Sequence, residues 1–322
     1  MADSSRSNFT LMAGVSAIAL LIGVSVLIAF LKKQPETKKG KDKTPVASST
    51  QPSKIAGGTY ESSGVAVAAD DQVLFVDDKD PAHILAMMFD ASGSQSGDVI
   101  PVELGVEIED AEDITFDGHN YIVVGSQFRK GAGKGAGLVR FTYDPASHTV
   151  ANVVTVDGLK EMLLSNVPEL AGARDQKRTE EAINIEGLGY DPRSNEILLG
   201  FRNPLVDAKA LIVPITLKDA NAAFNADNIT FGPAKTLDLG GEAIRSIAWD
   251  AVKNGFLIIG GAPEGEKKSN FTLWSWDGSG QPAKLQDLDE KIKPEGVTRM
   301  GDSILIVGDA GYYMRLADQQ AQ

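Results

Sequence analysis

The sequence predicts an all-β protein, a β-propeller of four-stranded blades preceded by one transmembrane helix. Two observations predict the propeller: one hairpin pattern recurs five times, and further apolar segments after four of the copies give about four strands per repeat. A third observation predicts the helix, because one long apolar run near the N-terminus carries no charge.

The composition suits a globular protein with many tight turns and limits its partners. Of 322 residues, 43% are hydrophobic and 33 are glycine, which excludes global disorder. A formal net charge of -13 with no compensating basic face disfavours nucleic acid as a partner. The chain has no cysteine, so disulfides, thiolate metal sites and cysteine nucleophiles are excluded.

After a polar tail, residues 1–9, the predicted transmembrane helix covers residues 10–31, TLMAGVSAIALLIGVSVLIAFL. This length is enough to cross a hydrocarbon core of roughly 30 Å. The run ends in bulky residues followed by Lys32 and Lys33 and not in a small-residue cleavage site. We therefore interpret it as a retained signal anchor, with a cleaved signal peptide as the alternative.

The charges around this helix and the size of the domain indicate opposite orientations. Six lysines follow the helix before residue 44, whereas only Arg6 precedes it, and the positive-inside rule would keep the C-terminal side in the cytoplasm. Long domains, however, translocate despite such charges. We expect the extracytoplasmic side, the periplasm or the cell surface. Residues 32–54 are polar and predict a disordered linker, so the folded domain covers residues 55–322.

Each copy of the repeated pattern predicts two strands of period-2 alternation joined by a turn. The copies read SSGVAVAADDQVLFVDD from Ser62, AEDITFDGHNYIVVGS from Ala111, IEGLGYDPRSNEILLGF from Ile185, IRSIAWDAVKNGFLIIGG from Ile244 and PEGVTRMGDSILIVGD from Pro294. The last copy has only one more strand, GYYMRL, whereas a spare strand, KIAGGTYE, precedes the first. We therefore predict that the two termini share a blade and close the ring.

The interval between the second and third copies is longer than a blade requires. It contains GLKEMLLSNVPELAGARDQKRTEEA, in which leucines and Met162 recur at helical spacing before Pro168 and Gly172. We interpret residues 158–183 as an inserted helix and loop, with a degenerate sixth blade as the alternative. A β-sandwich is the alternative fold, and a doubly wound α/β fold is less favoured because regularly alternating helices are missing.

Alignment of the copies places one polar position of each just before the strand that should line the central channel: Ser63, Glu112, Glu186, Arg245 and Glu295. Innermost strands of a propeller converge on its axis, so these residues can form one site. Carboxylate oxygens suit a hard cation, which makes the three glutamates candidate calcium ligands and Arg245 a candidate ligand-binding residue. Alternatively, Glu186 and Glu295 accept hydrogen bonds from backbone amides or pair with Arg245 in a polar channel.

A second tier lies where the second strands end: Asp78, Lys79, Ser126, Gln127, Phe201, Arg202 and Asp309. We expect Asp78, Asp309 and Arg202 to contribute to ligand binding. The three histidines fall in turns or begin an outer strand, which disfavours a Ser-His-Asp triad. The stretch RKGAGKGAG from Arg129 lacks the spacing of a phosphate-binding loop and predicts a hairpin loop.

The segment INIEGLGYDPRSNEILLGFRNPL, followed by KALIVPITL, resembles the signature of a bacterial β-propeller family of unknown function. In that signature an E-G-L strand leads to an L-L-x-G-F-R-x-P turn, and the opening ESSGVAVAADDQVLFVDD resembles the family's first blade. The resemblance covers about residues 60–316, and its specific part is confined to residues 184–217.

This resemblance implies a propeller similar to phytase-like esterases and gluconolactonase-like propellers, whose channel carboxylates hold calcium or another divalent ion. The corresponding ligands here would be Glu112, Glu186 and Glu295. Arg245 departs from that pattern, because it puts a cation where a fourth ligand would lie. Arg202 and Pro204 match the signature turn, and Arg202 could grip a substrate carboxylate or phosphate or instead fix the turn.

Two functions follow from these residues. The first is a membrane-anchored module of the cell envelope that binds a protein or a small ligand at its channel mouth. The second is a calcium-dependent hydrolase of phosphoesters or lactones, in which the metal activates water and Glu186 or Glu295 acts as base. The residues alone do not decide between them.

Overall fold

The protein is described from a computed structural model that covers residues 51–128, 136–173, 182–266 and 270–317. The chain divides into two units, residues 1–45 and 46–322, and every described residue belongs to the second. The predicted transmembrane helix at residues 10–31, most of the linker and residues 129–135 lie outside the described residues. Within the described ranges, no helix is long and apolar enough to cross a membrane.

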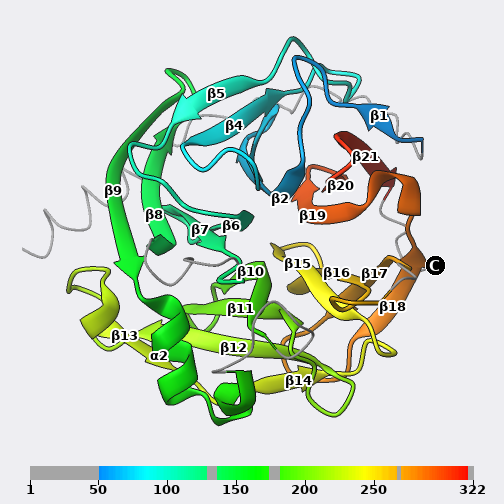
Figure 1. Ribbon diagram of the computed structural model, residues 1–322. Helices are drawn as coiled ribbons and strands as arrows, with labels where there is room; N and C mark the ends of the chain where they lie inside the picture. Colours follow the sequence, from blue (N-terminus) through cyan, green and yellow to red (C-terminus); the bar gives the residue numbers. More distant parts are fainter. Residues whose placement is uncertain (1–50, 129–135, 174–181, 267–269, 318–322) are drawn as a thin grey trace, which may run out of the picture. The chain divides into compact units, whose positions relative to one another are not determined.

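Five antiparallel sheets surround a common axis, which confirms the predicted five-bladed propeller (Figure 1). Blade 1 contains β2 (Ser62–Ala69), β3 (Gln72–Asp77), β4 (His83–Met88) and β5 (Ile100–Glu103). Blade 2 contains β6 (Ala111–Phe116), β7 (Tyr121–Gly125), β8 (Ala136–Asp144) and β9 (Thr149–Asp157). Blade 4 contains β15 (Ala243–Asp250), β16 (Gly255–Gly261), β17 (Thr272–Trp276) and β18 (Ala283–Asp287).

Blade 3 has a divided outer edge. It contains β10 (Asn184–Asp191), β11 (Glu196–Asn203), β12 (Ala210–Leu217), β13 (Ile229–Phe231) and β14 (Lys235–Leu237). Both short strands pair with β12, β13 along its C-terminal part and β14 along its N-terminal part. Together they occupy the place of one fourth strand, with the short helix η3 (Ala226–Asn228) before β13.

Blade 5 joins the two ends of the described chain, as predicted. It contains β19 (Pro294–Met300), β20 (Ser303–Gly308) and β21 (Tyr312–Ala317), and the fourth strand is the N-terminal β1 (Ser53–Lys54), which pairs with β21. The hydroxyl of Ser62 also donates to the backbone oxygen of Gly308 at 2.7 Å, which links blade 1 to blade 5. The short helix η4 (Glu290–Ile292) precedes the blade.

A helix lies between blades 2 and 3 in the sequence interval that was too long for a blade. It comprises α2 (Leu159–Asn166) followed by the 3-10 helix η2 (Pro168–Ala173). Leu159, Leu163 and Leu170 are fully buried and join the core between these two blades. Gly137 permits this packing, because a Cβ there would lie 2.3 Å from the Cβ of Leu159.

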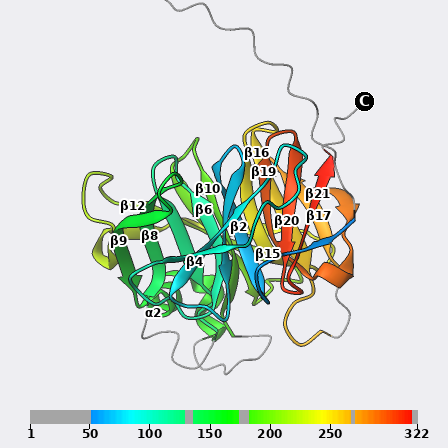
Figure 2. The ribbon, with the colours of Figure 1, turned by 90° about the horizontal axis from the view of Figure 1, so that it is seen from above.

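The core consists of five apolar clusters, one at each junction between neighbouring blades. Because successive side chains of a strand point to opposite faces, each strand supplies both of its junctions. Leu74 of β3, for example, packs toward blade 2, while the adjacent Phe75 packs toward blade 5. Figure 2, which is turned by 90° from Figure 1, shows the innermost strands running side by side in roughly the same direction.

Candidate functional site

Each innermost strand has a β-bulge at the same level along the channel, and the residues at these bulges form the candidate site. The pairing register shifts at Gly64, Glu112, Glu186, Arg245 and Glu295, in β2, β6, β10, β15 and β19 respectively. A bulge leaves one residue out of the ladder and re-aims its side chain. In blade 1 the bulge falls one residue after the predicted Ser63, so four charged side chains and one glycine share this position.

The residue after the bulge closes the centre of the ring. In blade 2 this residue is Asp113, whose Oδ2 accepts hydrogen bonds from the backbone amide of Leu188 at 2.8 Å, the hydroxyl of Ser246 at 3.1 Å and the amide of Ile247 at 3.3 Å. Its Oδ1 accepts from the amide of Ile114 at 2.9 Å. One carboxylate thus ties together the innermost strands of blades 2, 3 and 4.

The other blades leave room for this carboxylate. A Cβ at Gly64 would lie 2.3 Å from the Cα of Asp113, so blade 1 needs a glycine there. Ser246 extends the network to blade 5, because its Oγ accepts from the amide of Val297 at 3.3 Å. Burial raises the pKa of Asp113 well above its usual range, although the hydrogen bonds that it accepts oppose the rise.

Arg245 lies between two of the predicted metal ligands. Its Nε is 2.8 Å from Oε2 of Glu186, and its Nη2 contacts Oε1 of Glu295. The first contact is an ion pair by distance only, since the N–H direction gives neither atom a hydrogen bond. Ser63 completes the set, because its hydroxyl donates to the other oxygen of Glu295 at 3.3 Å. Burial lowers the pKa of the Arg245 guanidinium, and the charge of Glu186 opposes that effect.

Arg202 is held on the opposite side of Glu186. Its Nη1 lies 2.9 Å from Oε1 of Glu186 and 3.3 Å from Oε2 of Glu264, and its Nε donates to the backbone oxygen of Ala262 at 3.3 Å. Burial lowers the pKa of Arg202, but the charge and hydrogen bond of Glu186 outweigh it, so that the pKa is raised. Both arginines of the channel therefore already have carboxylate partners.

Glu112 differs from the other channel glutamates. It is half-buried, and its carboxylate makes no hydrogen bond or ion pair with any residue in the described ranges. Burial raises the pKa of Glu112 well above its usual range, and the negative charges of Glu186, Asp110 and Asp78 add to the rise, while Arg245 opposes it. Such a carboxyl group in a polar channel is a candidate for function.

Two buried amide groups lie beside these glutamates. Gln127 and Asn184 are 1% and 3% exposed, and Oε1 of the first and Oδ1 of the second have no hydrogen-bond partner among the described residues. The Asn184 amide nitrogen donates to Oε1 of Glu186 at 3.0 Å, and that of Gln127 to the backbone oxygen two residues earlier at 3.2 Å. The backbone oxygen of Ser126 accepts from the amide of Ile185 at 2.9 Å, which brings the two segments together.

The predicted second tier is held by lysines. Lys79 lies 3.0 Å from Asp78 and 2.7 Å from Glu61, and the hydrogen bond with Glu61 is the main reason that the pKa of Lys79 is raised to about 12. Lys293 lies 2.5 Å from Asp309. Asp78 and Asp309 are thus half-buried carboxylates with basic neighbours on the surface.

The remaining second-tier residues have structural contacts. Phe201 is fully buried in the core between blades 2 and 3. The hydroxyl of Ser126 donates to Asp110, a buried residue at a positive φ of 58°. Gln127 also has a positive φ, 61°, so the two residues that flank this part of the channel mouth both adopt a backbone conformation that is uncommon without glycine.

The three glutamates proposed as calcium ligands do not form a common ligand set. Glu186 and Glu295 are bound to Arg245, which matches the alternative interpretation of these residues. In the part of the chain that the structure describes, no group of three or more His, Asp and Glu side chains is arranged to hold a metal ion. The residues therefore do not fit the calcium site that the family resemblance implies.

Sequence reasoning missed three residues of this site: Asp113, Asn184 and Glu264. Asp113 directly follows the aligned Glu112, whereas the other four copies have glycine or serine at that position. This difference is the sequence feature that could have identified Asp113. Asn184 lies two residues before Glu186. Glu264 follows the end of β16 in a loop, and no repeat position marks it.

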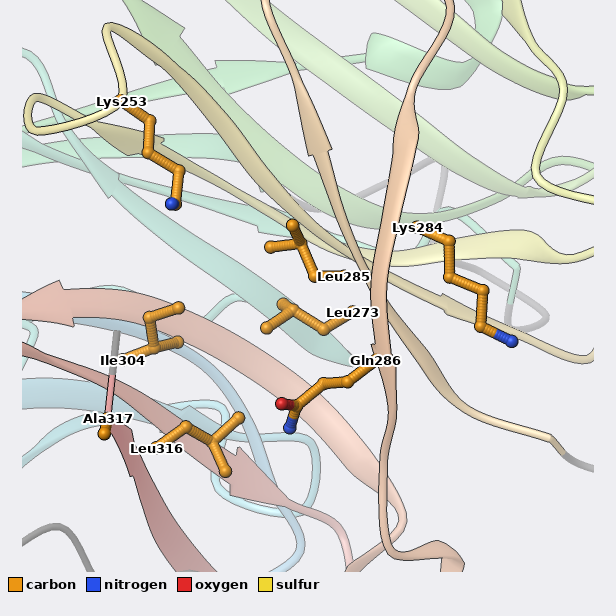
Figure 3. Close-up of a pocket in the computed structure, with 8 residues that line it drawn as sticks. All are labelled: Lys253, Leu273, Lys284, Leu285, Gln286, Ile304, Leu316 and Ala317. Carbon is orange, nitrogen blue, oxygen red and sulfur yellow. The ribbon is translucent and has the colours of Figure 1, made fainter. Parts of the chain in front are cut away.

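A separate pocket lies between blades 4 and 5, away from the channel residues (Figure 3). It is lined by Lys253, Leu273, Lys284, Leu285, Gln286, Ile304, Leu316 and Ala317. Its floor is part of the core between these blades, and Lys284 lies 2.6 Å from Asp287. None of the channel side chains reaches this pocket.

The fold is similar to that of solved propeller structures, all at low sequence identity. An enzyme of carbohydrate-active family AA12 from Trichoderma reesei has 10% identity, covers 87% of this chain and 99% of its own, and gives a TM-score of 0.45. Virginiamycin B lyase from Staphylococcus aureus has 10% identity, with 83% and 98% covered and a TM-score of 0.40. A candidate 6-phosphogluconolactonase from Bacteroides fragilis has 14% identity, with 79% and 82% covered and a TM-score of 0.41.

No protein-family model matches the sequence. No curated protein matches it by sequence either. Identities this low concern the fold and do not indicate an activity.

Proposed function

We propose that this propeller is a binding module whose ligand site is the channel mouth, formed by Glu112, Gln127 and Asn184. The observation that supports it is the Glu112 carboxylate, which has no partner among the described residues although it lies beside several other acids. A half-buried carboxylate without a partner destabilises the fold, and such costs are retained most often where function requires them.

The geometry favours binding over catalysis. Glu186 and Glu295 would have to leave Arg245 before either could hold a metal ion or act as a base. Arg202 would likewise have to leave Glu186 before it could grip a substrate anion. The other channel glutamates are therefore held in ion pairs, and Glu112 is the described carboxylate that is available to bind a ligand.

The calcium-dependent hydrolase is the second candidate, and one observation favours it. A carboxyl group whose pKa is raised can keep its proton and act as a general acid, and Glu112 is such a group. Its partner in catalysis would have to come from the engaged glutamates, which is why this function is the weaker proposal.

We also propose that residues 10–31 anchor the chain in a membrane and that the propeller lies on the extracytoplasmic side, where it meets an envelope protein or a small ligand. The uncharged run of residues and the polar linker after it support this proposal. Protease treatment of intact and of permeabilised cells tests it. Digestion of the propeller only after permeabilisation by an agent that breaks the inner membrane would contradict the extracytoplasmic side.

A ligand screen tests the binding function. The melting temperature of the full chain is measured with members of four chemical classes: amines, carboxylates and phosphates, neutral sugars, and divalent cations. A ligand of the mouth should raise the melting temperature of the wild type but not of Glu112→Gln. It should also be recovered unchanged after incubation, as judged by NMR. Turnover would favour the hydrolase, and a lack of any Glu112-dependent response in all four classes would refute the binding site.

A further inference from the structure

We propose that the ligand of the channel mouth is a primary ammonium group, bound by the carboxylate of Glu112 and by the amide oxygens of Gln127 and Asn184. This inference rests on the proposed binding function and names its ligand class.

The charge balance favours a cation. Arg245 is shared between Glu186 and Glu295, and Arg202 between Glu186 and Glu264. An anionic ligand would have to displace one of these carboxylates from a largely buried arginine, and breaking a buried ion pair is strongly destabilising. A cationic ligand displaces nothing at Glu112.

Two described lysines also have carboxylate neighbours. Lys79 and Lys293 have Asp78 and Asp309 as neighbours. The ammonium of Lys160 donates to the backbone oxygen of Gln127 at 3.1 Å, so it leaves the amide oxygen of that side chain without a donor. A ligand cation therefore meets carboxylate and amide oxygens that the described residues do not use.

The number of acceptors favours a primary ammonium group. Of the described site residues, Gln127 and Asn184 have a buried amide oxygen without a hydrogen bond, and Glu112 adds a carboxylate. An –NH3+ group carries three N–H donors and no acceptor, which matches these three acceptor groups in number and sign. A calcium ion takes six to eight oxygen ligands, more than these side chains offer.

The acceptors are held in place before a ligand arrives. The amide nitrogen of Asn184 is fixed by Glu186, which is itself held by both arginines, and the buried amide oxygen has no donor among the described residues. Gln127 is fixed at its amide nitrogen in the same way. Preorganised acceptors reduce the entropy lost on binding. The net charge of -13 also attracts cations to the surface of the chain.

Isothermal titration of the full chain with butylamine and with a lysine peptide that has blocked termini tests the proposal. Glu112→Gln should weaken binding at least tenfold, and Gln127→Met, which keeps the length but removes the amide oxygen, should weaken it severalfold. Glu103→Gln is the matched control, since Glu103 lies in the outer strand β5 with a side chain 83% exposed, and it should bind as the wild type does. Thermal melts of each variant confirm that it folds.

The comparison ligands decide the class and its source. Tetramethylammonium has the charge but no N–H donors, and binding as tight as that of butylamine would overturn the proposal. So would Glu112-dependent binding of calcium without binding of amines, which would leave the binding function standing. No Glu112-dependent ligand of any class would refute both. If amines bind, equal affinity for butylamine and peptide indicates a small amine, and a clear preference for the peptide indicates a lysine of a protein partner.

Discussion

The ion pairs around Arg245 allow the sharpest test of how the channel is built. Arg245, Glu186 and Glu295 are held together at the bulge level, and Arg245 is only 6% exposed. Arg245→Met keeps most of the side-chain volume but removes the charge, so two carboxylates lose their shared cation in a largely buried place. Breaking a buried ion pair from one side costs about 3–5 kcal/mol.

The prediction becomes specific when the carboxylates are neutralised as well. The triple variant Arg245→Met, Glu186→Gln and Glu295→Gln removes all three charges of this group together, and replacing a whole buried network is often close to neutral. We therefore expect the triple variant to regain most of the stability that the single substitution removes. Arg202 keeps the Glu264 carboxylate and the amide oxygen at position 186 as acceptors.

Equilibrium unfolding of the full chain in urea and mild detergent measures these differences, with tryptophan fluorescence as the signal, since all three tryptophans lie in blade 4, the blade that carries Arg245. Lys284→Met is the control for loss of a cation from a surface pair, because Lys284 is 50% exposed, and it should cost less than about 1 kcal/mol. If Arg245→Met costs no more than this control, or if the triple variant is no more stable than the single one, the channel glutamates do not depend on Arg245 and the reasoning is refuted.

Three further predictions concern the channel. Glu112→Gln should leave stability unchanged near pH 4 and raise it relative to the wild type as the pH increases. The reason is that the wild type loses stability on ionising a group whose pKa is raised above its ordinary value of 4.5. A pH series of urea midpoints measures this difference in stability, and a difference that stays constant with pH would contradict the prediction. Gly64→Ala should destabilise by at least about 3 kcal/mol, since its Cβ would meet backbone atoms of Asp113, whereas Gly172→Ala, with open space around it, should be nearly neutral in the same assay. Asp113→Ala should lower the free energy of unfolding by about 3–6 kcal/mol, because it leaves buried hydrogen-bond donors of blades 3 and 4 without an acceptor. Hydrogen exchange of the Leu188 amide should also accelerate, and unchanged exchange there would count against this role of Asp113.

Much of the fold could be predicted because a propeller repeats its local signals. Each copy carries the same alternation of apolar residues, and the spare strands at the two ends predict closure in one blade. The prediction placed the N-terminal strand in KIAGGTYE, residues 54–61, whereas the paired residues are Ser53 and Lys54, so that the two overlap only at Lys54. These two residues have no apolar pattern that would predict a strand. They form one because they pair with the free edge of β21, and that edge exists only in the folded ring.

The common level of four channel residues could be predicted, but not how they pair. Alignment of the copies found Glu112, Glu186, Arg245 and Glu295 at one level, and the structure places all four at the bulges. Which glutamate meets the arginine depends on the order of the blades around the axis and on side-chain directions, which sequence alignment does not contain. Arg245 neighbours Glu186 on one side and Glu295 on the other because blade 4 lies between blades 3 and 5.

The same order explains why Glu112 is the group left over. Blade 2 lies between blades 1 and 3, so the bulge neighbours of Glu112 are Gly64 and Glu186. The first offers no charge, and the second is already held by Arg202 and Arg245. Among the described residues, the two channel arginines are held by Glu186, Glu295 and Glu264, and Glu112 has no ion-pair partner. An ammonium group from outside the chain would supply the missing charge beside Glu112.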